Sequence, residues 1–265
     1  MTDSSPQPEQ PPGVPALDRA LTVLECIAQS RKGFSVSELS RRLTLPKSSV
    51  HLILRTFERR GYLQKQPTGG RYRFGLKLMS LGHLALDGVE LRDEARPILQ
   101  RLVLATGLTA HLGILERGEI VIIERVDAAT PVRVVSFVGR RVKVHSTAVG
   151  KALLAFLPRE LQDAQLAQAP LEPQNARTIA SPDDFRRELE HVHRLGYAFC
   201  DEEDELGVRA VGAPILSSEG TALAAISIVG TTGQLGIERV AAIGEAVRDA
   251  AQEISAHMQK LRVPA

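Results

Sequence analysis

Residues 35–63 have the sequence SVSELSRRLTLPKSSVHLILRTFERRGYL, in which two short helical patterns are joined by a tight turn. Ser35 and Glu38 have the spacing of a capping box, so the first helix is expected to begin at this serine. Pro46 suits the first position of a second helix, and Gly61 is expected to end it. The pattern predicts a helix-turn-helix. Its inward-facing apolar positions are Leu39, Leu43, Val50, Ile53, Leu54 and Phe57.

A β-hairpin is expected directly after the second helix. Residues 62–66 and 71–74 alternate around the turn sequence Pro67-Thr-Gly-Gly70, which is typical of the wing that follows a helix-turn-helix. The first turns of such a helix contact base edges in the major groove, and basic residues of the wing reach the DNA backbone or the minor groove. The candidate DNA-binding residues are Ser35, Lys47, Ser48, Ser49, His51, Arg55, Arg71 and Arg73.

Charge is divided unevenly along the chain. Residues 1–80 carry 13 Lys and Arg against 6 Asp and Glu, which is +7, and residues 81–265 carry the remaining 20 and 25, which is −5; the sum is the net charge of +2. A basic N-terminal third on a mildly acidic body favours a nucleic-acid-binding module joined to a second domain. The alternative is a helical hairpin inside an enzyme, whose basic residues are merely solvated.

Composition indicates a cytoplasmic globular protein with no membrane partner. Hydrophobic residues make up 43% of the 265 residues, but they form no long apolar run. The polar, acidic N-terminus lacks the pattern of a signal peptide. Cys26 and Cys200 are too few for a disulfide framework and fit a reducing compartment. Residues 1–15, rich in Pro, Ser and Gln, are expected to be a disordered leader.

The order of the predicted elements indicates an α+β fold. A winged helix-turn-helix domain is expected over residues 16–75, a connecting helix over 76–90 and a second domain over 91–265. Strands in hairpin-like pairs with helices at the margins favour a mainly antiparallel sheet in the last domain. Its expected helices are 91–106, 147–157, 159–167, one that opens at Ser181, and 237–261; its expected strands are 112–116, 120–126, 132–138, 197–200, 208–216 and 222–229.

Several motifs along the chain resemble a known family. The N-terminal ones are LDRALTVL from Leu17, LPKSSVH from Leu45, RGYL from Arg60 and YRFGL from Tyr72; the C-terminal ones are HSTAVGKALLA from His145, GYAFCDEEDELG from Gly196 and AAISIVG from Ala224. In this order and spacing they resemble the IclR-type bacterial transcriptional regulators, over almost all of the chain after residue 15. The resemblance implies a winged helix, a linker helix and a GAF-like or profilin-like effector domain, in a protein that acts as a repressor.

The resemblance also implies a ligand pocket around the segment that starts at His145. Free amides at the start of a helix, together with small side chains, favour the approach of a carboxylate. Strand positions opposite this helix complete the pocket in the family. Because only Ser227 and Cys200 are polar among them, we expect a pocket suited to a larger or partly apolar, for example aromatic, organic acid. The candidate effector-binding residues are Thr147, Ala148, Val149, Gly150, Cys200, Val208, Ala210, Ser227 and Val229.

Two other classes of function stay open at this point. The acidic run 201–205 with His145 would suit a metal-sensing regulator, although no metal-ligand spacing is clean. An enzyme with a nucleic-acid-binding tether would need a nucleophile and a base, and no such pair stands out. Gly150-Lys151 is not a phosphate loop, because His145 occupies the place of the required first glycine.

The expected protein is therefore a regulator without enzymatic activity, metal or cofactor. Its partners are a double-stranded DNA operator and a small organic acid. A single DNA-binding head makes too few contacts for operator-level affinity, so a homodimer or homotetramer is expected. One departure from the family pattern lies in the recognition helix, where Leu52 stands in place of the usual Arg.

Overall fold

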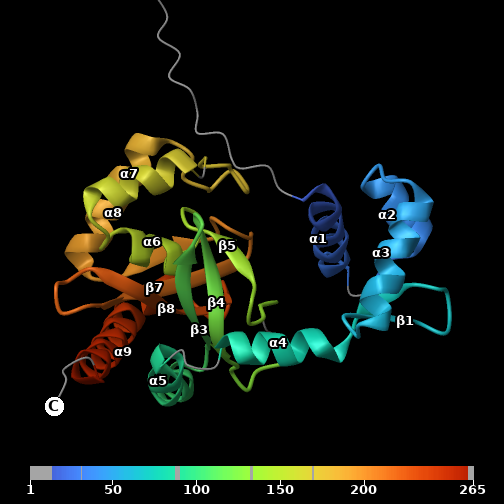
Figure 1. Cartoon of the computed structure of the whole chain (residues 1–265). Helices are drawn as coiled ribbons and strands as arrows, with labels where there is room; N and C mark the ends of the chain where they lie inside the picture. Colours follow the sequence, from blue (N-terminus) through green and yellow to red (C-terminus); the bar gives the residue numbers. More distant parts are fainter. Residues whose placement is uncertain (1–13, 31, 87–89, 132–133, 169, 262–265) are drawn as a thin grey trace, which may run out of the picture. The chain divides into compact units, whose positions relative to one another are not determined.

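The computed structural model describes residues 14–30, 32–86, 90–131, 134–168 and 170–261. The expected leader lies outside these residues up to position 13, and Pro15 already begins the first helix. The chain divides into two compact units, Met1–Gly88 and Val89–Ala265 (Figure 1). No helix among the described residues is long and apolar enough to cross a membrane.

The N-terminal unit is a small helical domain with a hairpin. Its core contains eight buried side chains from the first three helices and the hairpin, and Val23, Leu39, Val50 and Leu54 have no exposed surface. Burying each of these aliphatic side chains contributes roughly 1.5–3 kcal/mol. Its elements are α1 (Pro15–Ala28), α2 (Val36–Arg42), α3 (Lys47–Arg59), β1 (Leu63–Lys65), β2 (Tyr72–Phe74) and α4 (Leu76–Leu86).

The start of α2 and the turn to α3 follow from local chemistry. The Glu38 amide donates to the Ser35 hydroxyl, and the Glu38 carboxylate accepts from the Ser35 amide, which completes the predicted capping box. Thr44 has a φ of 53°, so the turn takes the left-handed conformation at a non-glycine residue. Pro46 is the N-cap of α3, one residue before the predicted position. The two helices are held about this turn by Ser40, which donates to the carbonyl of Leu45 at 2.6 Å.

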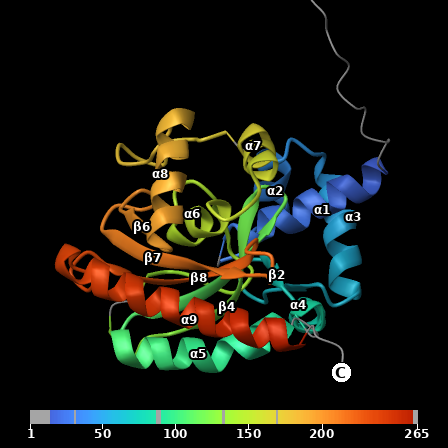
Figure 2. The ribbon, with the colours of Figure 1, turned by 90° about the vertical axis from the view of Figure 1, so that its left-hand side faces the viewer.

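The C-terminal unit is built on one antiparallel sheet with the strand order β5-β4-β3-β8-β7-β6. Figure 2 shows α5 and α9 against one face of this sheet and α6 and α8 over the other. The predicted α+β class with a mainly antiparallel sheet is confirmed. The elements are α5 (Glu90–Thr106), β3 (Thr109–Glu116), β4 (Glu119–Val126), β5 (Arg141–Lys143), α6 (Ala148–Leu154), α7 (Arg159–Gln168), α8 (Pro182–Leu195), β6 (Ala198–Asp201), β7 (Val208–Leu216), β8 (Ala222–Thr231), the 3-10 turn η1 (Ile237–Arg239) and α9 (Val240–Leu261).

The strand predicted over residues 132–138 is wrong for its described part. Residues 134–138 form a loop, and the neighbouring edge strand is β5 instead. The backbone carbonyls of Val135 and Ser136 accept hydrogen bonds from the side chains of Arg140 and Arg125. A strand ladder is therefore replaced by arginine contacts, which periodicity along the chain does not reveal.

Candidate functional sites

The polar side of α3 lies opposite its core side. Val50 and Leu54 are fully buried, whereas Lys47, Ser48, His51 and Arg55 are exposed, and Ser49 is half-buried. Because residues three and four apart share one helix face, this division leaves the first turns of α3 with small or basic side chains on the solvent side. Four of the predicted reading residues, Lys47, Ser48, His51 and Arg55, thus share one accessible face of α3, and Ser49 lies beside it.

Two of the other candidate DNA-binding residues have partners within the N-terminal unit. The Ser35 hydroxyl belongs to the capping box. The Arg71 guanidinium pairs with Glu38 and donates to the carbonyl of Gly33 at 2.8 Å, so it joins the wing to α2. The hydrogen bonds from Ser35 and the charge of Arg71 lower the pKa of Glu38. Arg73 is exposed on the wing strand β2.

Leu52 points away from the core of the N-terminal unit. Its side chain is 68% exposed and lines an apolar groove between α1 and α3, together with Leu17 and Leu21. The neighbouring Ile53 and Phe57 form the base of the same groove. At this position, where the resemblance led us to expect an Arg, Leu52 therefore extends an apolar surface.

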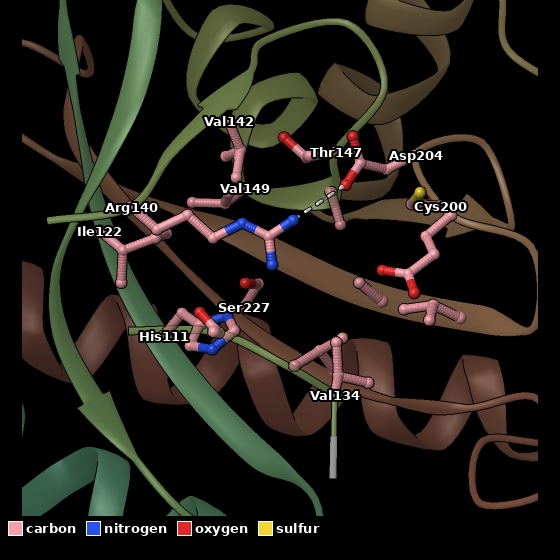
Figure 3. A pocket seen from close by; sticks show the side chains of 16 residues that line it. His111, Ile122, Val134, Arg140, Val142, Thr147, Val149, Cys200, Asp204 and Ser227 are labelled. Atoms are coloured by element: carbon pink, nitrogen blue, oxygen red, sulfur yellow. Dashed lines mark ion pairs between the residues drawn. The ribbon is translucent and has the colours of Figure 1, made fainter. Parts of the chain in front are cut away.

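The C-terminal unit contains a pocket between the start of α6, the sheet and the loop before β5. Figure 3 shows its side chains, and the cavity volume is about 70 Å³. Eight of the nine candidate effector-binding residues line it, namely Thr147, Ala148, Val149, Cys200, Val208, Ala210, Ser227 and Val229.

Gly150 is the ninth candidate, and it lies outside the lining. Its amide donates to the Thr147 hydroxyl, which caps α6, and is therefore not free for a ligand. A Cβ at this position would stand 2.3 Å from the carbonyl oxygen of Val144. The glycine is needed because the backbone of α6 packs directly on the preceding segment.

The pocket also has lining residues that the sequence did not suggest. They make it more polar than expected, because a cation, two carboxylates and an imidazole join Ser227 and Cys200. The sequence signals were weak: Arg140 follows a glycine in a loop, and His111 is a polar residue inside an apolar strand. The additional lining residues are His111, Ile122, Val134, Ser136, Arg140, Val142, Asp204 and Glu205.

Arg140 and Asp204 face each other across this pocket. Their closest nitrogen and oxygen are 3.9 Å apart, and each side chain is about 28% exposed. The other oxygen of Asp204 accepts from the Ser146 hydroxyl at 2.9 Å. The Arg140 guanidinium also donates to the carbonyl of Val135. The aspartate is thus held by the hydrogen bond from Ser146, whereas its contact with Arg140 is longer and weaker.

His111 is a buried, neutral imidazole in the pocket wall. Its exposure is 8%, and burial, with the charges of Arg125 and Arg140, lowers its pKa to about 4. Its Nε2 atom has no hydrogen-bond partner among the described residues. A buried imidazole nitrogen without a partner is costly, so it marks a place where a ligand would find a ready polar contact.

A buried ion cluster lies on the other side of α6. Lys151 is 1% exposed, and its Nζ donates to Glu203 at 2.7 Å, to Glu188 at 2.8 Å and to the carbonyl of Phe199 at 2.6 Å. Burial opposes its charge, but the two carboxylates raise the pKa of Lys151 above its usual range. It is therefore a cation that ties α6 to α8 and to the loop after β6.

The chemistry of this unit favours binding. Burial raises the pKa of Cys200 to about 12, and the thiol donates to the carbonyl of Ser146, so it is not a nucleophile near neutral pH. Burial also lowers the pKa of His145, whose Nε2 lies 3.0 Å from the carbonyl oxygen of Glu172. Among the residues that the structure covers, no group of three or more His, Cys, Asp or Glu could hold a metal ion.

Comparisons with known proteins agree over most of the chain. Residues 16–67 match the family described as the IclR helix-turn-helix domain, and residues 83–256 match the family described as bacterial transcriptional regulator IclR C-terminal. The chain is 32% identical to the HTH-type transcriptional regulator XynR of Escherichia coli strain K12, covering 92% of this chain and 97% of that protein.

Two further relatives bear on activity. The transcriptional repressor IclR of Escherichia coli strain K12 is 30% identical, with 91% of this chain and 89% of that protein covered. The crystal structure of an IclR homologue complexed with 4-hydroxybenzoate, from Microbacterium hydrocarbonoxydans, superposes with a TM-score of 0.76 at 29% identity, covering 92% of this chain and 99% of that one. The relatives are regulators, and one was crystallised with an organic acid.

Proposed function

The chain belongs to the IclR family of bacterial transcriptional regulators, and we propose that it is a repressor whose hold on operator DNA is controlled by a small organic acid. The observation that carries the effector class is the pocket of the C-terminal unit, in which Arg140 is the one Lys or Arg among the described lining residues and lies beside an apolar wall that includes Val142, Val149 and Val229. Ligand sites combine an apolar wall with a few convergent polar groups, and a guanidinium suits a carboxylate.

The pocket supports capture of an acid without any catalytic step. A carboxylate that enters the cavity competes with Asp204 for Arg140. The closest nitrogen and oxygen of Arg140 and Asp204 are 3.9 Å apart, so a ligand carboxylate at hydrogen-bond distance would bind the guanidinium more strongly. The solved homologue that holds 4-hydroxybenzoate supports the same chemical class. The thiol of Cys200 is protonated and buried, so it contributes packing to this site.

The DNA side of the proposal rests on the exposed face of α3. Lys47 and Arg55 are exposed basic side chains on it, with Ser48 and His51 between them, and Arg59 is exposed one turn further along. Arg73 on the wing is a further candidate for a phosphate contact. Ser35 and Arg71 hold α2 and the wing in place, so their proposed contribution to DNA binding is largely through that geometry.

Assembly and location follow from the same proposal. Two heads are needed to match the two half-sites of a palindromic operator, so the active form is a homodimer or homotetramer. A repressor must meet the chromosome, so we place the protein in the cytoplasm. Sedimentation of the free protein and of its DNA complex measures the number of subunits directly.

The DNA half is tested with the region upstream of the protein's own gene. Lys47→Ala and Arg55→Ala should each weaken binding several-fold, and each should lower the slope of log affinity against log salt by about 1 if the lost contact is a phosphate. Arg194→Ala, an exposed basic residue of the C-terminal unit, is the matched control. Equal affinity for the two α3 variants and wild type would contradict the proposed surface.

The effector half is tested by adding organic acids to the preformed complex. An acid that raises the melting temperature of the free protein should also release the DNA, since allosteric coupling of 1–3 kcal/mol corresponds to about 5–150-fold in affinity. A reporter driven by the same DNA should rise when this acid is supplied. Stabilisation by acids that leaves DNA binding and the reporter unchanged would contradict effector control.

A further inference from the structure

We propose that Arg140 and His111 divide recognition of the effector between them, so that the ligand is an acid carrying a second hydrogen-bonding oxygen. Arg140 binds the carboxylate, and His111 with Ser227 binds a hydroxyl or carbonyl oxygen on the same molecule. This inference rests on the proposed function of the pocket and deepens it. The assignments of Arg140 and His111 do not follow from the motifs of the sequence, because both residues lie outside them.

Arg140 is positioned for this task by its backbone. Its carbonyl accepts from the amide of Ile122 at 2.9 Å, and its own amide donates to Phe137 at 3.1 Å, so the residue is fixed beside β4. Its side chain then crosses the cavity toward Asp204 (Figure 3). A fixed backbone with a loosely paired guanidinium lets the charge change partner without refolding of the loop.

Asp204 holds its place when Arg140 leaves it. Its hydrogen bond from Ser146 at 2.9 Å does not depend on the arginine. The adjacent Glu203 is tied to Lys151 at 2.7 Å. The ligand carboxylate therefore competes with the 3.9 Å contact to Asp204 and with the hydrogen bond from Arg140 to the carbonyl of Val135, while the acidic loop stays anchored.

The second contact lies in the sheet. His111 on β3 is the direct register partner of Ser227 on β8, and both side chains line the cavity. Figure 3 places the imidazole and the hydroxyl side by side below Arg140. Because the His111 pKa of about 4 leaves the ring neutral near pH 7, it can donate or accept but carries no charge for a second carboxylate. A hydroxyl or carbonyl oxygen is the group that suits this pair.

The wall between the two polar ends is aliphatic. Ile122, Val142, Val149 and Val229 line it, so the body of the ligand between its two oxygens is apolar. The cavity volume of about 70 Å³ is less than half of the roughly 150 Å³ that accommodates a benzene ring in an engineered cavity. A short carbon chain fits around Arg140 as it stands, whereas a ring requires the arginine to swing outward.

The test uses full-length protein and pairs of acids that differ only in the second oxygen: 4-hydroxybutyrate against butyrate, and 4-hydroxybenzoate against benzoate. Calorimetric titration should give at least one pair in which wild type prefers the hydroxylated acid by about tenfold or more, since an unpartnered buried polar group costs about 1–3 kcal/mol. His111→Leu should bring the ratio of the two affinities close to one, and His111→Gln should retain part of it.

The carboxylate end is tested with two variants that leave His111 in place. Arg140→Gln should weaken both acids of the pair about tenfold or more and leave their ratio unchanged. Asp204→Asn should strengthen both acids, because it removes the competing carboxylate and keeps an oxygen for Ser146. Melting temperatures and operator binding of each variant show that it is folded.

The outcomes separate this inference from the proposed function. An unchanged ratio in folded His111→Leu, or full affinity in Arg140→Gln, overturns the division of roles even if acids still release the DNA. Failure of both pairs to bind wild type at millimolar concentration overturns it as well. If the predicted ratios are found but acid binding has no effect on DNA binding, the result would count against the proposed function instead.

Discussion

Removal of the Lys151 ammonium, as in Lys151→Met, is expected to destabilise the C-terminal unit strongly. The substitution leaves a side chain of similar length but removes a cation that is 1% exposed. Glu203 and Glu188 would then face each other without their common partner, and the carbonyl of Phe199 would lose its donor. The loss of stability arises from the unpaired carboxylates and carbonyl that remain in the interior, not from a loss of side-chain volume.

The magnitude follows from that burial. Breaking a buried ion pair by removing one partner costs about 3–5 kcal/mol, because the remaining charge is desolvated without compensation. Glu203 is 7% exposed, so this range applies to its contact with the lysine. Glu188 has a side chain that is 23% exposed, so solvent screens it and its share is smaller. A cost of about 4 kcal/mol is therefore expected.

Urea denaturation followed by circular dichroism measures this cost, with the midpoint and slope fitted for each variant. The double variant Lys151→Met with Glu203→Gln should cost less than the sum of the two single variants, since it leaves one buried carboxylate fewer. Glu205→Gln, an exposed neighbour on the same loop, is the control and should change stability little. A loss below about 1 kcal/mol for Lys151→Met, or strict additivity in the double variant, would refute the reasoning.

Three other changes have defined outcomes. The pKa of His111 is about 4 in the folded protein and 6.5 in the unfolded chain, so the unfolded state binds more protons between these pH values. The free energy of unfolding should therefore fall by up to about 3 kcal/mol as the pH drops through this window. In urea denaturation at several pH values, His111→Gln should lack this part of the pH dependence. Gly150→Ala should cost about 1–3 kcal/mol by calorimetry, whereas Gly82→Ala, with open space around it, should be neutral or stabilising. Ser35→Ala should cost about 1 kcal/mol, seen as faster amide exchange at the start of α2; unchanged exchange would contradict the cap.

Local chemistry was enough to predict most of the fold. The capping box at Ser35, the proline before α3 and the cap at Ser181 each act within a few residues, so the sequence displays them directly. The prediction of a strand over residues 134–138 was wrong for the opposite reason. The carbonyls of this segment are satisfied by Arg125 and Arg140, and hydrogen bonds from side chains leave no periodic signature in the segment that accepts them.

The pocket was predictable only in outline. The family motifs point to the start of α6 and to positions such as Ser227, and those residues do line one cavity. Gly150 was included for a free amide and a small side chain at the helix start, but its amide bonds the Thr147 hydroxyl and its smallness serves the contact with Val144. His111 was missed because its direction depends on its register with β8, and Arg140 because its reach depends on where its loop crosses the sheet.

Residues on two sides of α6 contact the pocket and the acidic loop beside it. Val149 faces the cavity, while Lys151, two residues on, holds the loop that carries Glu203 and Asp204. That loop is held by the hydrogen bonds of Glu203 with Lys151 and of Asp204 with Ser146, whereas its contact with Arg140 across the cavity is 3.9 Å. An acid that recruits Arg140 exchanges this contact and keeps the hydrogen bonds that hold the acidic loop, so we expect the change on binding to centre on the Arg140 side chain rather than on the core. The coupling to DNA should therefore disappear in Arg140→Gln, and it should persist in any Lys151 variant that still folds.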